Sequence, residues 1–440
     1  MFQRPRRLAM SVLAIASTLT ASPAFAQTPM KIDAADTAWM IGATGLVLMM
    51  TIPGLALFYA GMVRKKNVLA TMAQSLSATF LVSVLWALLA YSLTFTGNGA
   101  IIGSLSRIFL NGMGLNAISP WAPTIPESLF MIYQMTFAVI TVALVAGSVA
   151  DRLRFSAFVL FCVFWLFIVY VPIAHWIWGG GFLQSFGTID FAGGLVVHVN
   201  AGVAGLVAAL VVGKRRGYGH DNLAPFDLSL AVIGMGLLWV GWFGFNGGSA
   251  LAASPRAAMA IVCTHLAACA GAATWMAIEW KTRGKPSVLG MISGAVAGLG
   301  TITPASGFVT PMEALLIGLI AGSVCFWSCT WLKMKLGYDD SLDVFGVHGI
   351  GGLTGSLLAG VLAVGAISAS PELPNGVRGL LEGNVHLLWA QLAGIVVTAG
   401  WSGVATFGIL KLVSAIVPLR VRHEDEVIGL DVSQHGEALQ

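Results

Sequence analysis

Long stretches without charge are the feature that most limits what this chain can fold into. Eleven apolar stretches fall at about 38–60, 68–96, 126–149, 156–178, 191–213, 226–246, 257–279, 287–304, 311–333, 343–366 and 386–413. A membrane core of about 30 Å needs about 20 apolar residues in a helix, and most of these stretches have that length. With 57% hydrophobic and 10% charged residues in 440, we expect an all-α polytopic membrane protein with eleven transmembrane helices.

The positive charges between the stretches indicate how the chain is oriented. One set of alternate loops and the tail holds sixteen Lys and Arg residues, whereas the other set holds only Lys31, Arg107, Arg256 and Arg378. Cytoplasmic loops carry the excess of Lys and Arg in membrane proteins. The sequence therefore predicts a periplasmic mature N-terminus and a cytoplasmic C-terminus in a bacterial inner (plasma) membrane.

The first 26 residues have the pattern of a cleaved secretory signal peptide. Basic residues at Arg4, Arg6 and Arg7 precede an apolar run at 8–20, and an Ala-x-Ala site ends at Ala26. The run is too short, and its end too rich in small residues, for an additional transmembrane helix. A signal peptide agrees with a mature N-terminus outside the membrane.

The eleven stretches divide as five, five and one. Two halves with an odd number of spans must insert with opposite orientation, which is the arrangement of inverted-repeat transporters. We therefore expect an inverted 5+5 repeat plus a final helix. The expected boundaries are a first half at 27–213 with segments 1–5, a cytoplasmic linker at 214–225, a second half at 226–366 with segments 6–10, segment 11 with its preceding periplasmic loop at 367–413, and a cytoplasmic tail at 414–440.

A histidine in the last stretch of each half marks a candidate functional site. His198 follows Asp190 and His348 follows Asp343, and each histidine is followed by glycines four and seven positions later. These positions share one helical face, and the glycines let a second helix approach closely enough for the two rings to meet. An ionisable ring in lipid is costly unless it faces protein or a pore. A buried pair that only locks the halves together is the alternative.

Aromatic side chains gather at the outer ends of several stretches. Trp178 precedes three glycines, Phe245 precedes an Asn-Gly-Gly-Ser run that ends at Ser249, and Phe137 lies within the third stretch. An aromatic belt at the lipid headgroups is one interpretation, and it stays open for Tyr133 and Trp176. Glycines beside Trp178 and Phe245 instead favour close approach by a backbone or a ligand.

A small cation fits this group of side chains. Aromatic faces attract cations, and a nearby hydroxyl adds a hydrogen bond. Asp190 follows one loop later, where its carboxylate can add negative charge, cap the start of the fifth helix, or do both. Asp343 occupies the matching place before His348, so we expect it to support that helix start.

Six stretches form a pattern between residues 133 and 437. They are YQMTFA at 133–138, PIAHWIWGGG at 172–181, DFAGGLVVHVN at 190–200, GWFGFNGGSA at 241–250, DVFGVHG at 343–349 and GLDVSQHGE at 429–437. In this order they resemble the ammonium transporter (Amt/Mep/Rh) family, and within it the bacterial ammonia channel type. Met135, where the family often has a small residue, and Gly247, in place of a common alanine, depart from the pattern without removing an expected ligand.

The resemblance implies a site for recruiting ammonium at the periplasmic end. Phe137, Trp178 and Ser249 would form it, and Asp190 would be the essential aspartate close by. Phe137 would also stack with Phe245 to close the pore.

The resemblance further implies a pore below that gate. His198 and His348 would be twin histidines that line a narrow hydrophobic pore, one pore in each subunit of a homotrimer in the lipid bilayer. The expected function is uptake of ammonium or ammonia, with methylammonium as a further possible substrate and a PII-type nitrogen signalling protein as the partner of the cytoplasmic face. No cofactor, metal, catalytic residue or nucleic acid is expected.

The chemistry of ammonium fits such a pore. Amines are mostly protonated at neutral pH, and a bare cation is costly to move through apolar surroundings, whereas neutral ammonia is not. Potassium has no proton to lose, so a pore that requires deprotonation rejects it. Neutral imidazoles, with one donor and one acceptor each, suit the path of ammonia.

Three other functions remain as alternatives. An ammonium sensor would use the same pore to signal to a cytoplasmic partner. An intramembrane enzyme would need a nucleophile or a metal centre, but no Gly-x-Ser-x-Gly or His-Glu-x-x-His pattern occurs. A sodium-coupled carrier with broken helices is favoured only by interruptions such as Pro53 and Pro172.

Overall fold

The computed structural model describes residues 30–370 and 373–439, so the expected signal peptide at 1–26 lies outside the described residues. Ten helical segments in this part of the chain are long and apolar enough to cross a membrane. They are Ala34–Met62, Lys65–Phe95, Glu127–Val149, Phe155–Phe186, Gly194–Val212, Leu228–Gly247, Pro255–Arg283, Pro311–Leu336, Phe345–Leu362 and Val385–Ile416.

The eighth expected span is shorter than the others. It corresponds to α12 (Val288–Ile302), an apolar helix of 15 residues. Such a helix is about 22 Å long, less than a membrane core of about 30 Å. The polytopic helical fold is therefore established, whereas the count of eleven spans stays a prediction.

In chain order, the α-helices and strands fall into two groups, before and after the linker. Those before the linker are α1 (Ala34–Met49), α2 (Ala56–Met62), α3 (Val68–Leu85), α4 (Tyr91–Phe95), β1 (Ile118–Ser119), β2 (Ala122–Pro126), α5 (Glu127–Ala146), α6 (Phe155–Trp165), α7 (Val171–Trp178), α8 (Phe182–Phe186) and α9 (Asn200–Val212). Those after it are α10 (Leu228–Trp242), α11 (Pro255–Arg283), α12, α13 (Pro311–Trp327), α14 (Lys333–Leu336), α15 (Ile350–Leu362), α16 (Gly365–Ser368), α17 (Val385–Ile416) and α18 (His423–Ile428).

Wide π-helical turns interrupt several spans. One of them, Met50–Leu55, contains Pro53, whose missing N–H breaks the regular ladder of backbone hydrogen bonds. Three others are η7 (Gly194–Val199), η8 (Phe243–Gly247) and η10 (Phe345–Gly349), and they carry His198, Phe245 and His348. Turns of this kind are frequent at functional sites.

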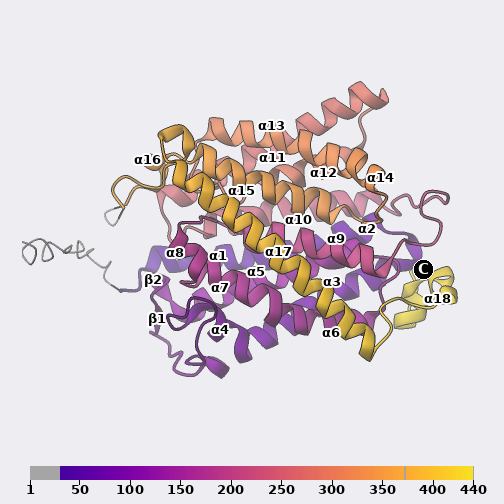
Figure 1. The fold of residues 1–440 in the computed structure, drawn as a ribbon, viewed down its shortest axis with the longest axis horizontal. Coiled ribbons are helices and arrows are strands. Elements are labelled where there is room, and N and C mark those ends of the chain that lie inside the picture. The colour runs from indigo at the N-terminus through magenta and orange to yellow at the C-terminus, as the bar shows by residue number, and fades with distance from the viewer. Residues whose placement is uncertain (1–29, 371–372, 440) are drawn as a thin grey trace, which may run out of the picture.

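The connecting elements gather at two opposite ends of the helical bundle (Figure 1). At one end lie the small sheet of β1 and β2 together with α8 and α16, and at the other lie α14 and α18. The amide of Asp33 donates to the carbonyl of Thr124 in β2, so the first described residues belong to the sheet end. The C-terminal helix α18 lies at the far end, and the two termini of the described chain are therefore on opposite faces, as the predicted topology requires.

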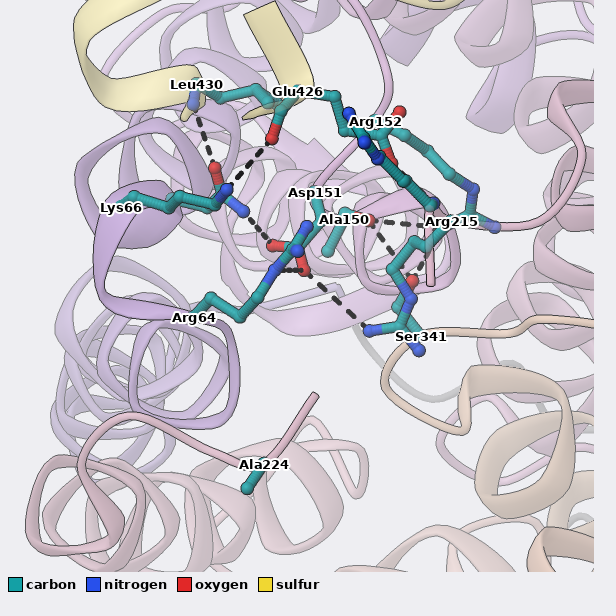
Figure 2. A network of polar contacts seen from close by, with 12 residues as sticks. Arg64, Lys66, Ala150, Asp151, Arg152, Arg215, Ala224, Ser341, Glu426 and Leu430 are labelled. Carbon is teal, nitrogen blue, oxygen red and sulfur yellow. Dashed lines mark hydrogen bonds and ion pairs between the residues drawn. The ribbon is translucent and has the colours of Figure 1, made fainter. Parts of the chain in front are cut away.

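Arg152 connects the two halves at the end that carries α18 (Figure 2). Its guanidinium is fully buried and donates five hydrogen bonds, to the carbonyls of Ser148, Ala150, Gly213 and Asp339 and to the hydroxyl of Ser341. Burial lowers the pKa of Arg152 to about 10, so the side chain is still charged at neutral pH.

The tail is held against the first half by direct hydrogen bonds. Lys66 Nζ donates to the carbonyl of Glu426 at 3.1 Å (Figure 2) and to that of Val427 at 2.7 Å. The amide of Leu430 donates to Asn67 Oδ1 at 2.8 Å. The carboxylate of Asp431 accepts from the amide of Ala70 at 2.8 Å. A charged tail would ordinarily be solvated, but this one is packed on the bundle.

Candidate functional site

The two histidines lie in contact in the middle of the bundle. His198 Nδ1 and His348 Nδ1 are 3.2 Å apart, and the ring centroids are 5.2 Å apart with 17° between the planes. Both side chains are buried, with exposed fractions of 1% and 5%. A neutral imidazole has one donor and one acceptor nitrogen, so one ring donates to the other. No described residue bonds the remaining nitrogen of His198, Nε2.

Glycines bring the two rings together by allowing the helices to cross at backbone contact. A methyl group at Gly202 would overlap the backbone of Gly349, beside His348. In the reciprocal place, a methyl group at Gly352 would lie 2.7 Å from the carbonyl oxygen of Gly194 and from the Cβ of His198. The glycine four residues after His198 therefore lies against the backbone beside His348, and the glycine four residues after His348 lies against His198. An inverted repeat predicts this reciprocal arrangement.

Asp190 caps the helix start that carries His198. Its two carboxylate oxygens accept from the amides of Gly193, Gly194, Leu195 and Val196 at 2.6–3.0 Å. Its own carbonyl accepts from Trp178 Nε1 at 2.7 Å. The carboxylate is thus committed to backbone amides, the second of the two roles expected for it.

The matching cap below His348 is Asp340 rather than Asp343. The carboxylate of Asp340 accepts from the amide of Phe345 at 2.7 Å, whereas that of Asp343 pairs with Lys333 Nζ at 2.7 Å. Asp343 reaches the helix start only through its backbone carbonyl, which accepts from Val347. Asp340 precedes His348 by eight residues, the same separation as Asp190 from His198. That equal spacing was the sequence signal for Asp340.

A stack of aromatic rings lies next to the histidine pair. The Phe137 and Phe245 centroids are 4.3 Å apart with 29° between the rings, and Trp178 meets Phe137 edge to face at 5.6 Å. On the other side, Phe245 is 6.3 Å from the ring of His198. Trp242, which the sequence analysis did not single out, stacks on His198 at 5.6 Å and 22°.

Outside the stack, a recess of about 270 Å³ is lined by the side chains predicted to recruit a cation. Phe137, Trp178, Ser249 and Asp190 all belong to this lining. The Ser249 hydroxyl donates to the carbonyl of Phe245 at 2.8 Å. The structure therefore brings together the four residues that the sequence placed on separate segments.

Tyr133 and Trp176 are buried rather than part of a belt at the lipid headgroups. Their exposed fractions are 0% and 6%. The Tyr133 hydroxyl donates to the carbonyls of Gly244 and Phe245 at 3.0 and 2.9 Å and so fixes the turn that carries Phe245. The indole of Trp176 donates to the carbonyl of Ile101 at 2.8 Å.

A narrow apolar chamber lies between the stack and an inner vestibule. The chamber volume is about 10 Å³, roughly the space for one water-sized molecule. Both histidines line it, with apolar neighbours such as Leu238 and Val296. His348 also lines the vestibule beyond, which has a volume of about 290 Å³. The histidine pair is thus the polar part of a narrow connection between two wider spaces.

Comparison with known proteins identifies the family. A family model described as the Ammonium Transporter Family matches residues 38–439. The chain belongs to the ammonium transporter family. Relatives in this family include an ammonium transporter of Bacillus subtilis (strain 168), 48% identical over 91% of this chain and 97% of that protein. Ammonium transporter Amt1 of Archaeoglobus fulgidus is 44% identical over 91% of this chain and 98% of its own length.

Solved structures of family members have the same fold. The crystal structure of Candida albicans Mep2 has a TM-score of 0.84 and 36% identity, covering 92% of this chain and 90% of that chain. A structure described as Sensor Amt Protein has a TM-score of 0.83 and 28% identity, covering 91% and 98%. This ammonium transporter family member is therefore a multi-pass membrane protein that transports ammonium, and not an enzyme.

Within residues 30–370 and 373–439, no three His, Cys, Asp or Glu side chains form a group that could hold a metal ion. His175 and His386, which lie on other segments than the twin histidines, contact backbone carbonyls instead. The polar side chains that line the chamber and the outer recess include the histidine pair and, in the recess, Gln134, Gln184, Asp190, Ser249 and Arg256.

Proposed function

We propose that ammonium is recruited at the outer recess, loses its proton, and crosses as ammonia past His198 and His348. Phe137, Trp178 and Ser249 provide the recruiting site. Their aromatic faces attract the cation and the hydroxyl accepts a hydrogen bond from it. Contact with these faces also removes water from one side of the ion, which prepares it for the dry path below.

The aromatic stack and the chamber reject the charged form. Phe137 and Phe245 close the path with two rings, and the space beyond them admits about one small molecule. A bare cation gains no compensation for lost water in such apolar surroundings, whereas neutral ammonia loses little. Because potassium cannot shed a proton, it does not pass.

The histidine pair replaces the hydrogen bonds that ammonia makes with water. His198 Nε2 is a buried polar atom of the chamber that no described residue bonds, and it offers a partner to the incoming molecule. Ammonium gives up its proton near Asp190 or His198, at the boundary between the recess and the chamber. The contact between the two rings, 3.2 Å from Nδ1 to Nδ1, is the observation that carries this proposal.

Current measurements on protein reconstituted into liposomes test the mechanism. On a solid-supported membrane, wild type gives a response to ammonium and none to potassium, because only ammonium can be deprotonated. His198→Ala removes the polar partner in the chamber and lowers the ammonium response. His198→Asp puts a negative charge in the chamber, which stabilises a bare cation, so potassium conducts. Unchanged exclusion of potassium by His198→Asp would contradict the role of the pair in selectivity.

An ammonium sensor is the second candidate function. The likeness to a protein described as Sensor Amt Protein supports it, at 28% identity. Relatives described as ammonium transporters are 42–48% identical, and they favour transport as the main activity. A variant that transports normally but no longer changes the behaviour of a cytoplasmic partner would separate the two functions.

The remaining expectations concern the subunit number, the membrane, the orientation of the chain and its partner. We propose a homotrimer in a bacterial inner membrane, with a cleaved signal peptide, a periplasmic mature N-terminus and a PII-type protein at the end that carries α18. The excess of Lys and Arg in alternate loops supports this orientation. Native mass spectrometry of the purified protein gives the subunit number, and protease protection in vesicles gives the location of the tail.

A further inference from the structure

Arg256 places a positive charge in the same outer recess that we propose for ammonium. Its side chain lines this recess together with Trp178, Ser249 and Asp190. A guanidinium is protonated at neutral pH. A transporter of a cation thus carries a permanent cation of its own at the proposed entrance.

Two phenylalanine rings hold this guanidinium in place. Arg256 Cζ lies 4.8 Å from the ring centre of Phe191 and 4.7 Å from that of Phe308, and the two rings meet edge to face at 5.6 Å. Arg256 Nε donates to the carbonyl of Gly307 at 2.8 Å. Distances below about 6 Å are those of cation–π contacts. Phe191, Phe308 and the Gly307 carbonyl therefore form an aromatic cage that the protein fills with its own cation.

No negative charge neutralises Arg256 directly. Within the described ranges 30–370 and 373–439, none of the ion pairs includes it. Asp190 shares the recess, but both its oxygens accept from backbone amides. Arg256 also stands in the first turn of α11, just after the N-cap Ser254, where the helix dipole opposes a positive charge. The nearest charge of opposite sign in the lining is therefore the Asp190 carboxylate, which shares the recess but does not pair with Arg256.

The recess has a second group of aromatic rings, and this group does not hold a cationic side chain of the protein. Phe137 and Trp178, with the Ser249 hydroxyl, are the faces proposed for ammonium, and no Lys or Arg in the described part of the chain lies over them. One recess thus combines a filled aromatic cage with a second aromatic site that is available to a ligand. A cation bound at the second site is repelled by the cation in the first.

We infer that Arg256 sets the affinity of the recess for ammonium by repelling it, so that the cation is held weakly and moves on to the pore. This inference rests on the proposed recruitment of ammonium at Phe137, Trp178 and Ser249. A space of 270 Å³ is about 8 Å across. Two unit charges about 8 Å apart change each other's binding by about two- to thirtyfold for an effective dielectric constant between about 80 and 20.

Charge-neutral and charge-preserving variants of Arg256 test the inference. Arg256→Gln removes the charge and lowers the half-saturating ammonium concentration of the transport current by about twofold or more at low salt. Arg256→Lys keeps the charge and stays close to wild type. Added sodium chloride reduces the difference between Arg256→Gln and wild type, because a Debye length of about 10 Å at 0.1 M screens an exposed recess. Arg256→Met, which retains the apolar stem between the rings, serves if Arg256→Gln does not assemble.

The outcomes separate this inference from the proposed function. Three results would contradict repulsion by Arg256. The half-saturating concentration could change equally in Arg256→Gln and Arg256→Lys, it could change in neither variant, or Arg256→Gln could weaken the binding of ammonium. Trp178→Leu is the matched variant for the recruiting site itself and raises the half-saturating concentration. If Trp178→Leu has no effect, the recruiting site is wrong, whatever Arg256 does.

Discussion

At the scale of single residues, Asp190 is the clearest case of opposing electrostatic effects. Burial raises the pKa of Asp190 to about 6, although four hydrogen bonds from backbone amides favour the ionised carboxylate. The carboxylate is ionised above that pH and holds the start of the helix that carries His198. Below it, a protonated carboxyl accepts those amides less well, so the support of His198 becomes weaker.

Stability and transport should therefore change in opposite directions as pH falls. The folded-state pKa lies above the ordinary value of about 3.9, so the folded protein takes up this proton before the unfolded chain does. By linkage, the contribution of Asp190 to the free energy of unfolding rises as pH falls from about 7 to about 4. We expect the ammonium current to fall across about pH 6 in the same interval. Thermal unfolding in detergent and currents at constant ammonium concentration measure the two effects.

Asp190→Asn is the control for this pH dependence. Its amide side chain does not titrate, so the difference in unfolding temperature between wild type and variant isolates the contribution of Asp190. Unfolding temperatures that change in parallel with pH in the two proteins would show that Asp190 does not titrate in this interval.

At the scale of elements, the site depends on two wide helical turns and on glycines between them. His198 and His348 lie in the π-helical turns η7 and η10, which are followed directly by α9 and α15. The helices cross so closely that Gly202 meets the backbone of Gly349. A side chain at that crossing would separate the two rings, since interiors have little space to adjust.

Substitution of the crossing glycine tests this dependence. Gly202→Ala overlaps the backbone of Gly349, so we expect a loss of stability of about 1–3 kcal/mol and a reduced ammonium current. Gly400→Ala is the matched control, because Gly400 lies in the helix α17 with no atom within 4 Å of the added methyl group. That change should leave transport intact and stabilise the helix by about 0.5–1 kcal/mol. Equal thermal stability of the two variants would contradict the close crossing.

At the scale of the whole molecule, Arg152 joins segments that are far apart in the sequence. It bonds the carbonyl of Gly213 at the end of the first half and that of Asp339 in the second half. The following residue, Leu153, forms a β-bridge with Arg420, at the beginning of the tail. The Arg152 side chain therefore holds the two halves together, and the backbone beside it pairs with the segment that leads to the tail.

Loss of this side chain should destabilise the whole end of the bundle that carries α18. Arg152→Met keeps most of the volume but leaves several buried acceptors without a donor, which costs about 1–3 kcal/mol for each group that water cannot reach. We expect a large decrease in the unfolding temperature and easier proteolysis of the tail. Arg422→Met is the control, because the Arg422 side chain is 73% exposed and solvent screens its pair with Asp425. If both variants unfold at the wild-type temperature, Arg152 does not have this role.

Some residues of the candidate site could be predicted from the sequence, and others could not. His198 and His348 were predicted because an imidazole in an apolar stretch is unusual and because the spacing to the glycines repeats. Phe137, Trp178 and Ser249 were grouped through resemblance, since nothing in their separate segments says that they meet. Asp343 was expected to support the second helix start, and the choice between Asp343 and Asp340 needed the backbone direction at η10, which local pattern does not give.

By itself, the sequence determined that the chain is helical, crosses a membrane many times and belongs with ammonium transporters. Length, hydropathy and charge are local properties, and the lipid phase leaves a helix as the way to satisfy each backbone group of an apolar segment. Only the tertiary structure decided which side chains meet, because contacts between His198 and His348, or between Arg256 and the rings of Phe191 and Phe308, depend on how distant helices pack.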